Sequence, residues 1–354
     1  MTLPAPRGPI STAIIDALRG DEPGRLRAAA QGRAPQDPLV DDDLQLGLWV
    51  CYELHYRGLP AVAEHWEWHP DLVRVRRALE ERLLAALRGE LGSSTGSGTV
   101  PERLRALVDN DRGPELSKFL QREADLDQYR EFVVHRSIYQ LKEADPHTWA
   151  IPRLAGRAKA ALVEVQFGEY GDGHAARMHS ELYGAVLRGL RLDDGYAAYV
   201  DRVPGISLAV SNVMSLFGLR RELRGALVGH LAAYEMTSSA PCRRYAAGLR
   251  RLGLSDEVCA FYDVHVTADA LHEQLAAYDL CGALAEDEPE LADQILFGGA
   301  ACLHVENRFA EHVLDHWSSA RSSLRGDAPA NDRTGACGPA SEAGLPALAW
   351  RPAV

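Results

Sequence analysis

The stretch that most constrains the fold is His265-Val-Thr-Ala-Asp269-Ala-Leu-His272, which lies in a long segment with helical periodicity. This segment runs from about 255 to 285, contains no proline, and has its one glycine near the far end. At about 100° per residue, positions i, i+4 and i+7 lie within roughly 60° of one another on a single helical face. Two imidazoles and a carboxylate on one face are typical of a metal-ligand set. Two helix histidines with a capping or salt-bridging aspartate are the alternative interpretation.

Apolar residues recur at helical spacing along most of the chain, and no convincing run alternates with the period of a strand. The sequence therefore predicts an all-α protein, with one long helix from Pro114 to about residue 142 and a short helix near 12–18. The expected organisation is a mobile N-terminal segment over 1–38, a helical extension over 39–91, a Gly/Ser-rich linker over 92–100, a helical core domain over 101–318 and a flexible tail over 319–354.

Composition excludes several classes of function. The net charge of −12 and the pI of about 5.6 argue against nucleic acid or a membrane as a partner, since both interactions need concentrated positive charge. No apolar run approaches the ~20 residues of a transmembrane helix, and the first residues lack the pattern of a signal peptide. The six cysteines are scattered without any C-x-x-C pair, so we expect buried, reduced thiols in a cytoplasmic protein.

A second group of potential ligands lies in Glu169-Tyr-Gly-Asp-Gly-His-Ala-Ala-Arg-Met-His179. On an ideal helix, Glu169 and His179 would be about 80° away from a common face, so they can meet one metal only if the backbone breaks between them. Gly171 and Gly173 permit such a break. A helix–turn–helix with two unrelated polar residues is the alternative.

Two further glutamates lie at positions where a carboxylate needs a positively charged partner. Glu143 lies at the C-terminal end of the predicted helix over 114–143, where its charge opposes the helix dipole unless a cation faces it. The cation could be a metal, Lys142 or an arginine. Glu235 lies in an otherwise apolar helix, so a metal or a salt bridge to Arg243 or Arg244 would have to compensate its burial.

Together these segments supply four carboxylates and three imidazoles, which is more than a single metal ion needs. Mixed carboxylate and imidazole ligands favour iron or manganese over a structural zinc site. Four carboxylates can neutralise and bridge two divalent ions, as in the dinuclear sites of helical bundles. The candidate metal ligands are Glu143, Glu169, His179, Glu235, His265, Asp269 and His272.

The sequence resembles the haem-oxygenase-like diiron oxidases, or iron-containing redox enzymes, over roughly 110–318. The resemblance rests on Leu-Lys-Glu143-Ala-Asp-Pro-His-Thr, on Glu169-Tyr-Gly-Asp-Gly followed by His179, on Glu235, and on H-x-x-x-D-x-x-H at 265–272. It implies a haem-oxygenase-like helical bundle without haem, preceded here by an N-terminal helical extension. It also implies two iron ions, and the extra carboxylate, Glu143, is a feature of the N-oxygenating branch.

The resemblance implies an O₂-dependent enzyme that N-oxygenates a small amine, amino acid or guanidine through a peroxo-diiron(III) intermediate. The catalytic carboxylates would be Glu143, Glu169 and Glu235, and an external electron donor would have to re-reduce the irons. In this hypothesis Glu169, His179 and Glu235 serve one iron and the bridge, and the residues of the 265–272 motif serve the other. The alternatives are cleavage or desaturation of a C–C bond of an amino or fatty acid, and a non-catalytic ligand-binding helical protein.

Other polar residues have less specific interpretations. Glu53, His55 and Tyr56 are expected in a helix pair that packs on the core or at a homodimer interface, the latter by analogy only. Arg136 and Tyr139 precede Glu143 by one to two turns and are either neighbours of the metal site or part of a structural network. The polar residues of the last helix, which include His304, Glu306, His312 and His316, suggest a solvated surface.

Overall fold

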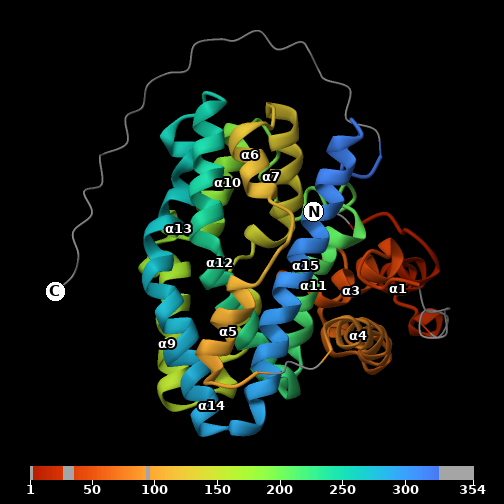
Figure 1. The fold of residues 1–354 in the computed structure, drawn as a ribbon. Helices are drawn as coiled ribbons and strands as arrows, with labels where there is room; N and C mark the ends of the chain where they lie inside the picture. Colours follow the sequence, from red (N-terminus) through yellow and green to blue (C-terminus); the bar gives the residue numbers. More distant parts are fainter. Residues whose placement is uncertain (1–2, 27–35, 93–95, 327–354) are drawn as a thin grey trace.

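The computed structural model describes residues 3–26, 36–92 and 96–326, with the backbone alone for 267–271. Every regular element in these ranges is a helix, so the all-α prediction is confirmed. None of the described helices combines the length and the apolar character needed to cross a bilayer. Figure 1 shows a helical bundle with three N-terminal helices packed along one side, namely α1 (Pro9–Gly20), α3 (Asp42–Glu53) and α4 (Pro70–Leu91).

Helix α1 is attached to α3 by a cap that α3 provides. The Asp43 carboxylate accepts hydrogen bonds from the backbone N–H groups of Ile10 (2.8 Å) and Ser11 (2.7 Å), which an isolated helix start leaves unpaired. Ile14 and Ile15 are fully buried. The helix is therefore longer than the short one expected near 12–18, because a distant carboxylate completes its first turn.

Helix α12 (Arg224–Arg251) forms the centre of the bundle and packs against α13 (Asp256–Gln274) and α15 (Ala292–Ser318). Glycines bring α12 and α15 into backbone contact. A Cβ atom at Gly229 would lie 1.8 Å from the Ile295 carbonyl oxygen, and one at Gly298 would lie 1.9 Å from that of Ala226. The other main helices are α5 (Val100–Asp109), α9 (Gly156–Glu169), α10 (His179–Gly189) and α11 (Gly205–Leu219).

The helix predicted from Pro114 to about residue 142 is in fact two helices, α6 (Leu116–Arg122) and α7 (Leu126–Gln140). The Asp125 side chain accepts a hydrogen bond from the Gln128 N–H (2.8 Å), and the Gln128 side chain accepts one from the Asp125 N–H (3.0 Å). This reciprocal cap starts a new helix at a point where the periodicity alone suggests continuation.

The helix predicted over 255–285 is confirmed as continuous helical backbone, with one irregularity. After α13 the chain forms a π-helix, η7 (Leu275–Gly282), before it returns to an α-helix in α14 (Ala283–Asp287). π-helices are rare in proteins, and those that do occur often lie at functional sites. The short connecting elements are η1 (Pro23–Arg25), η2 (Glu64–Trp68), α8 (Asp145–Thr148), η3 (Ile151–Arg153), η6 (Arg221–Leu223) and η8 (Pro289–Leu291).

Parts of the expected terminal segments and linker lie outside the described residues, namely 1–2, 27–35, 93–95 and 327–354. The described start of the C-terminal segment packs against α7. The backbone N–H and the hydroxyl of Ser323 both donate hydrogen bonds to the Glu131 carboxylate, at 2.8 and 2.7 Å. Residues 319–326 therefore have a defined place on the bundle.

The cysteines in the described part of the chain are buried and free, as the sequence predicted. Burial raises the pKa of the Cys51 thiol to about 12, so this group stays protonated. These side chains thus behave as small apolar residues. The sixth cysteine, Cys337, lies outside the described residues.

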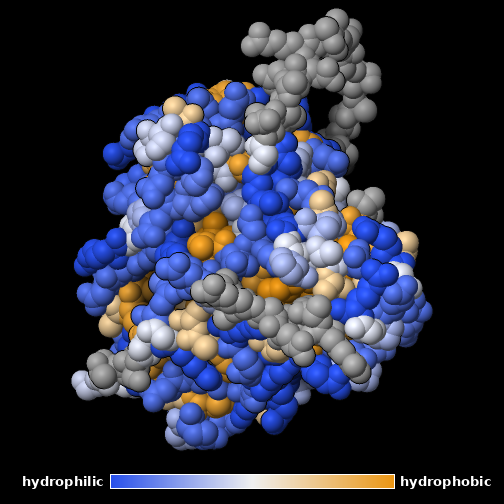
Figure 2. All heavy atoms as spheres, turned by 90° about the vertical axis from the view of Figure 1, so that its right-hand side faces the viewer, coloured by the Kyte–Doolittle hydropathy of each residue, from blue (hydrophilic) through white to orange (hydrophobic). Residues whose placement is uncertain are grey.

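The outer face of the N-terminal helices is mainly hydrophilic, with apolar residues visible in separate places (Figure 2). Trp68, at the end of η2, is the most exposed large apolar side chain described, at 61%. Scattered exposed apolar residues are normal on a monomer, so they do not argue for an interface by themselves. The homodimer stays a prediction.

A glycine in the close contact between α12 and α15 should tolerate substitution less well than a glycine in open space. Gly298→Ala would place its Cβ against the Ala226 carbonyl, so we expect the free energy of unfolding to fall by about 1–3 kcal/mol or more. Gly89→Ala in α4 meets no atom within 4 Å and should stabilise by about 0.5–1 kcal/mol. Chemical denaturation measures both changes, and equal effects would contradict this packing.

Candidate metal centre

Helix α13 directs His265 and His272 into the bundle, where each is only 7% exposed. The Nδ1–H of His265 donates a hydrogen bond to the Phe261 carbonyl (2.7 Å). Its Nε2 lies 3.6 Å from the Glu143 Oε1 atom, so the imidazole faces that carboxylate. The side chain of Asp269 lies outside the described residues, and its place in the site stays a prediction.

The chain breaks between Glu169 and His179, as the metal-ligand interpretation required. Helix α9 ends at Glu169, two 3₁₀ turns follow (η4, Gly171–Gly173, and η5, Ala175–Arg177), and α10 begins at His179. Gly171 has a φ of +66°, and a Cβ atom there would lie 2.5 Å from the Arg177 carbonyl carbon. This reversal brings His179 Nδ1 to 2.7 Å from Glu169 Oε2.

Glu143 lies in the turn that follows α7, and not on the helix itself. The next residue, Ala144, has a φ of +74°, which is unusual for a residue with a side chain. Lys142, one candidate for the compensating cation, instead donates a hydrogen bond to Glu53 (3.0 Å). The Glu143 carboxylate lies near imidazoles, 4.0 Å from His179 Nδ1 and 3.6 Å from His265 Nε2.

Glu235 lies on α12 and is 7% exposed. Its Oε2 atom is 3.5 Å from His272 Nδ1. Arg244, one of the two alternative partners, donates a hydrogen bond to the Ser117 hydroxyl (3.0 Å). The Glu235 carboxylate therefore faces an imidazole of the predicted ligand set.

The described ligands form two groups that share Glu169. In each group one ligand atom per residue lies within 4.8 Å of all the others, the first group being Glu143, Glu169, His179 and His265 and the second Glu169, Glu235 and His272. Glu169 Oε2 faces His179, whereas its Oε1 lies 3.6 Å from His272 Nδ1. A carboxylate with one oxygen towards each group has the arrangement of a bridging ligand. The grouping differs from the predicted partition, because His265 lies with His179 and Glu235 lies with His272.

The chemistry of the site fits bound divalent cations. Among the described residues, neither Glu143 nor Glu169 forms an ion pair with a lysine or arginine. The Glu143 Oε2 atom is buried and makes no hydrogen bond within that part of the chain. Burial raises the pKa of Glu169, but His179 first, and then His265 and His272, outweigh burial and lower that pKa to about 2. Buried carboxylates grouped with imidazoles form a donor set that a divalent cation can bind.

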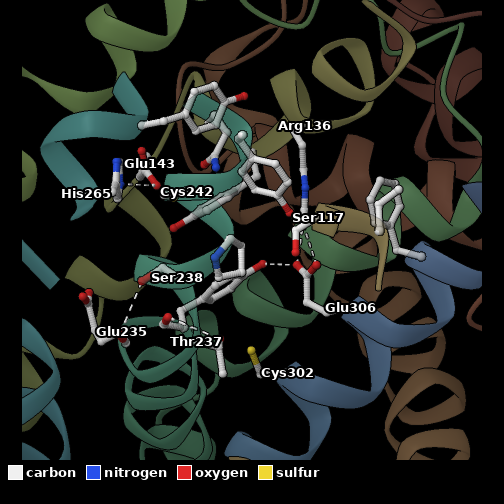
Figure 3. Close-up of a pocket in the computed structure, with 18 of the residues that line it drawn as sticks. Ser117, Arg136, Glu143, Glu235, Thr237, Ser238, Cys242, His265, Cys302 and Glu306 are labelled. Carbon is white, nitrogen blue, oxygen red and sulfur yellow. Dashed lines mark hydrogen bonds and ion pairs between the residues drawn. The ribbon is translucent and has the colours of Figure 1, made fainter. Parts of the chain in front are cut away.

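A cavity of about 230 Å³ opens beside these ligands. Figure 3 shows Glu143, His265 and Glu235 on one side of it and Arg136 and Glu306 on the other. The guanidinium of Arg136 donates two hydrogen bonds to Glu306 (2.8 and 2.6 Å), and the Tyr234 hydroxyl donates a third (2.5 Å). The cavity thus has ligand carboxylates at one end and a compensated ion pair at the other.

The position of Glu306 differs from the expected one. Glu306 does not lie on a solvated surface but lines the cavity, and its side chain is 22% exposed. Burial raises the pKa of Glu306, but Arg136 and then the Tyr234 hydroxyl outweigh burial and hold it below its ordinary value. A signal was present in the sequence, since Cys302 and Ala310 place apolar side chains one turn before and after Glu306.

A buried histidine pair was not predicted. His147 Nε2 lies 3.3 Å from His230 Nδ1, and His147 lines the cavity. Burial lowers the pKa of His147 to about 4 and that of His230 well below its ordinary value, so both rings are neutral at neutral pH. The two residues are 83 positions apart in the sequence, and no local pattern connects them.

Comparison with known proteins points to an iron-containing family. The family model of the iron-containing redox enzymes, which carries the haem-oxygenase name, matches residues 130–307. This range contains every candidate ligand. A search of curated proteins found no match.

The two ligand groups predict the stoichiometry of metal binding. The metal-free full-length protein should bind two equivalents of Co²⁺, because two groups of donors share one carboxylate. His265→Ala should remove one equivalent and His272→Ala the other, whereas His304→Ala, on the outer side of α15, should leave both. Titration followed by visible absorption counts the equivalents. Two equivalents in all three variants would contradict the assignment.

Proposed function

The chain belongs to the family of iron-containing redox enzymes, and on that premise we propose that it is an O₂-dependent non-haem diiron oxygenase. Its proposed reaction is the N-oxygenation of a small amine, amino acid or guanidine. The observation that carries the proposal is the Glu169 carboxylate, whose two oxygens face two separate groups of ligands beside a cavity.

The donor set indicates which residues would hold the two irons. Glu143, His179 and His265 would bind one iron, Glu235 and His272 the other, and Glu169 both. Asp269 remains the further proposed ligand from the sequence motif. When bound, a pair of Fe(II) ions supplies the electrons that reduce O₂ to an oxidant for the substrate.

An apolar wall on one side of the centre excludes water from it. The Phe261 ring lies 4.5 Å from the ring of His265, and the Tyr183 ring lies 4.9 Å from that of Phe261. Both aromatic side chains are buried and line the cavity. A dry wall of this kind strengthens the electrostatic interactions within the site. It also keeps the ring of His265 in the orientation that its hydrogen bond to Phe261 fixes.

The cavity favours a small polar substrate over a fatty chain. Its volume of about 230 Å³ suits a small molecule, and its far end is formed by the Arg136–Glu306 pair and the Tyr234 hydroxyl. An apolar chain that ended there would exclude water from these groups without offering them a hydrogen bond. An amine or guanidine can instead direct its reacting nitrogen towards the ligand carboxylates and place polar groups at the ion pair.

Tyr139 is suited to hold a proton at the substrate. Burial raises the pKa of its phenol well above the ordinary value, and the nearby carboxylates of Glu143, Glu169 and Glu235 raise it further. Its Oη therefore stays protonated and can donate a hydrogen bond to a bound substrate.

The electron balance of the proposed reaction requires a reductant. One oxygen atom of O₂ is inserted into an N–H bond of the substrate, and the other leaves as water. The formation of this water consumes two electrons and two protons that the substrate does not supply. We propose an external electron donor as the source, because the sequence carries no fingerprint of a flavin or nicotinamide site.

Anaerobic loading with Fe(II), followed by mixing with O₂ and candidate substrates, tests the function. We expect O₂ uptake and a product that has gained oxygen at nitrogen, identified by mass spectrometry with isotopically labelled O₂. His272→Ala should abolish the uptake, while His304→Ala should retain it because its side chain pairs with Glu90 at the surface.

Other outcomes of this experiment distinguish the alternatives. Loss of a carbon fragment, or a new double bond without oxygen in the product, would identify a C–C cleaving or desaturating oxidase. If the wild-type protein neither binds iron nor takes up O₂, it is a non-catalytic binding protein.

A further inference from the structure

A buried ion pair connects the N-terminal helices to the turn that carries Glu143. The Lys142 Nζ atom lies 3.0 Å from Glu53 Oε2, and their side chains are 1% and 0% exposed. Glu53 is the last residue of α3, and Lys142 directly precedes the proposed ligand. The family match begins at residue 130, so Glu53 lies outside the matched range.

Several other groups near the end of α3 hold the same turn. The Tyr196 hydroxyl donates a hydrogen bond to Glu53, and the Lys142 ammonium lies 4.4 Å from the centre of the Tyr56 ring. Arg57 donates a hydrogen bond to the Leu141 carbonyl (3.2 Å). Both residues that precede Glu143 are thus fixed by residues 53–57.

The opposite side of the turn is tied to another ligand. The Gln166 side chain donates a hydrogen bond to the Ala144 carbonyl (2.8 Å), and Gln166 lies on α9 three residues before Glu169. Ala144 holds its positive φ of +74° between these contacts. A strained residue persists where the surrounding structure over-determines it. The position of Glu143 therefore depends on contacts from both sides of the turn.

We propose that the Glu53–Lys142 pair positions Glu143 for metal binding, so that the N-terminal helices complete the metal centre. The physical reason is competition between charges. A buried ammonium without Glu53 would be drawn to the carboxylates of its own turn, Glu143 and Asp145. A salt bridge from Lys142 to Glu143 would remove a ligand from the group that contains His179 and His265.

This inference rests on the metal centre of the proposed function and is independent of the substrate. The experiment is a Co²⁺ titration of the metal-free full-length protein. Glu53→Gln keeps the shape of the side chain but removes its charge. We expect it to weaken, by about ten- to hundredfold, the equivalent that His265→Ala removes, and to leave the other equivalent unchanged.

The chain offers a matched control in Glu80→Gln. Glu80 forms an ion pair with Arg76 (3.2 Å) on α4, and their side chains are 2% and 10% exposed, so a buried charge is lost from the same N-terminal helices. Glu80 makes no ion pair with a proposed ligand in the described part of the chain. We expect Glu80→Gln to lower the melting temperature without a change in Co²⁺ affinity.

A rescue variant separates positioning from simple destabilisation. Glu53→Gln combined with Lys142→Met removes the competing ammonium as well as its partner. We expect this double variant to bind the affected equivalent more tightly than Glu53→Gln alone. If Glu53→Gln does not fold, Glu53→Asp replaces it, because the shorter carboxylate keeps the charge but displaces Lys142. It should then weaken the same equivalent by a few-fold.

The outcomes are distinguishable. Two Co²⁺ equivalents of wild-type affinity in Glu53→Gln or in Glu53→Asp would overturn the positioning role while leaving the proposed function intact. Equal weakening of both equivalents, or an equal effect of Glu80→Gln, would show a general structural role and would also overturn it. Failure of the wild-type protein to bind two equivalents would overturn the dinuclear centre, and this inference with it.

Discussion

The constraint on which this structure depends is the burial of carboxylates that have no lysine or arginine beside them. In the described part of the chain, the ion pairs of Glu143 and Glu169 are with imidazoles, and those of Glu169 lower its pKa to about 2. Burial of such charges is costly unless a cation compensates them. The ends of α9 and α10, the turn after α7, and the interiors of α12 and α13 all converge on this one point. A bundle with this interior is therefore explained by the metal that it would hold and not by packing alone.

Breaks in the helical backbone lie at the same place. Glu169 ends one helix, His179 begins the next, and Glu143 precedes a residue with positive φ. A regular helix can direct His265 and His272 to one side, but it cannot bring residues ten positions apart onto a common centre. The breaks between the helices bring these side chains together, which helical periodicity alone cannot do. The hydrogen bond from Gln166 to the Ala144 carbonyl then joins the turn after α7 to helix α9, which ends at Glu169.

The sequence allowed prediction of the features that depend on local pattern. The spacing of His265 and His272 fixes their common face, and Gly171 marks the break that brings His179 towards Glu169. The division between α6 and α7 was missed although Asp125 and Gln128 form a recognisable capping pair. Pairs that join distant segments had no comparable signal, and neither the contact between His147 and His230 nor that between Glu53 and Lys142 could be derived from spacing.

The basic groups near the centre show why these distant pairs matter for its chemistry. Arg136 and Lys142 lie on or directly after α7, close to Glu143 in sequence, and each is bound to a carboxylate from another helix. Glu306 of α15 pairs with the first and Glu53 of α3 with the second. A guanidinium or ammonium without such a partner would compete with a metal cation for the ligand carboxylates. The availability of the ligands is therefore a property of the whole tertiary structure. It follows that the motif residues alone do not define the centre, because helices at both ends of the chain keep neighbouring positive charges away from it.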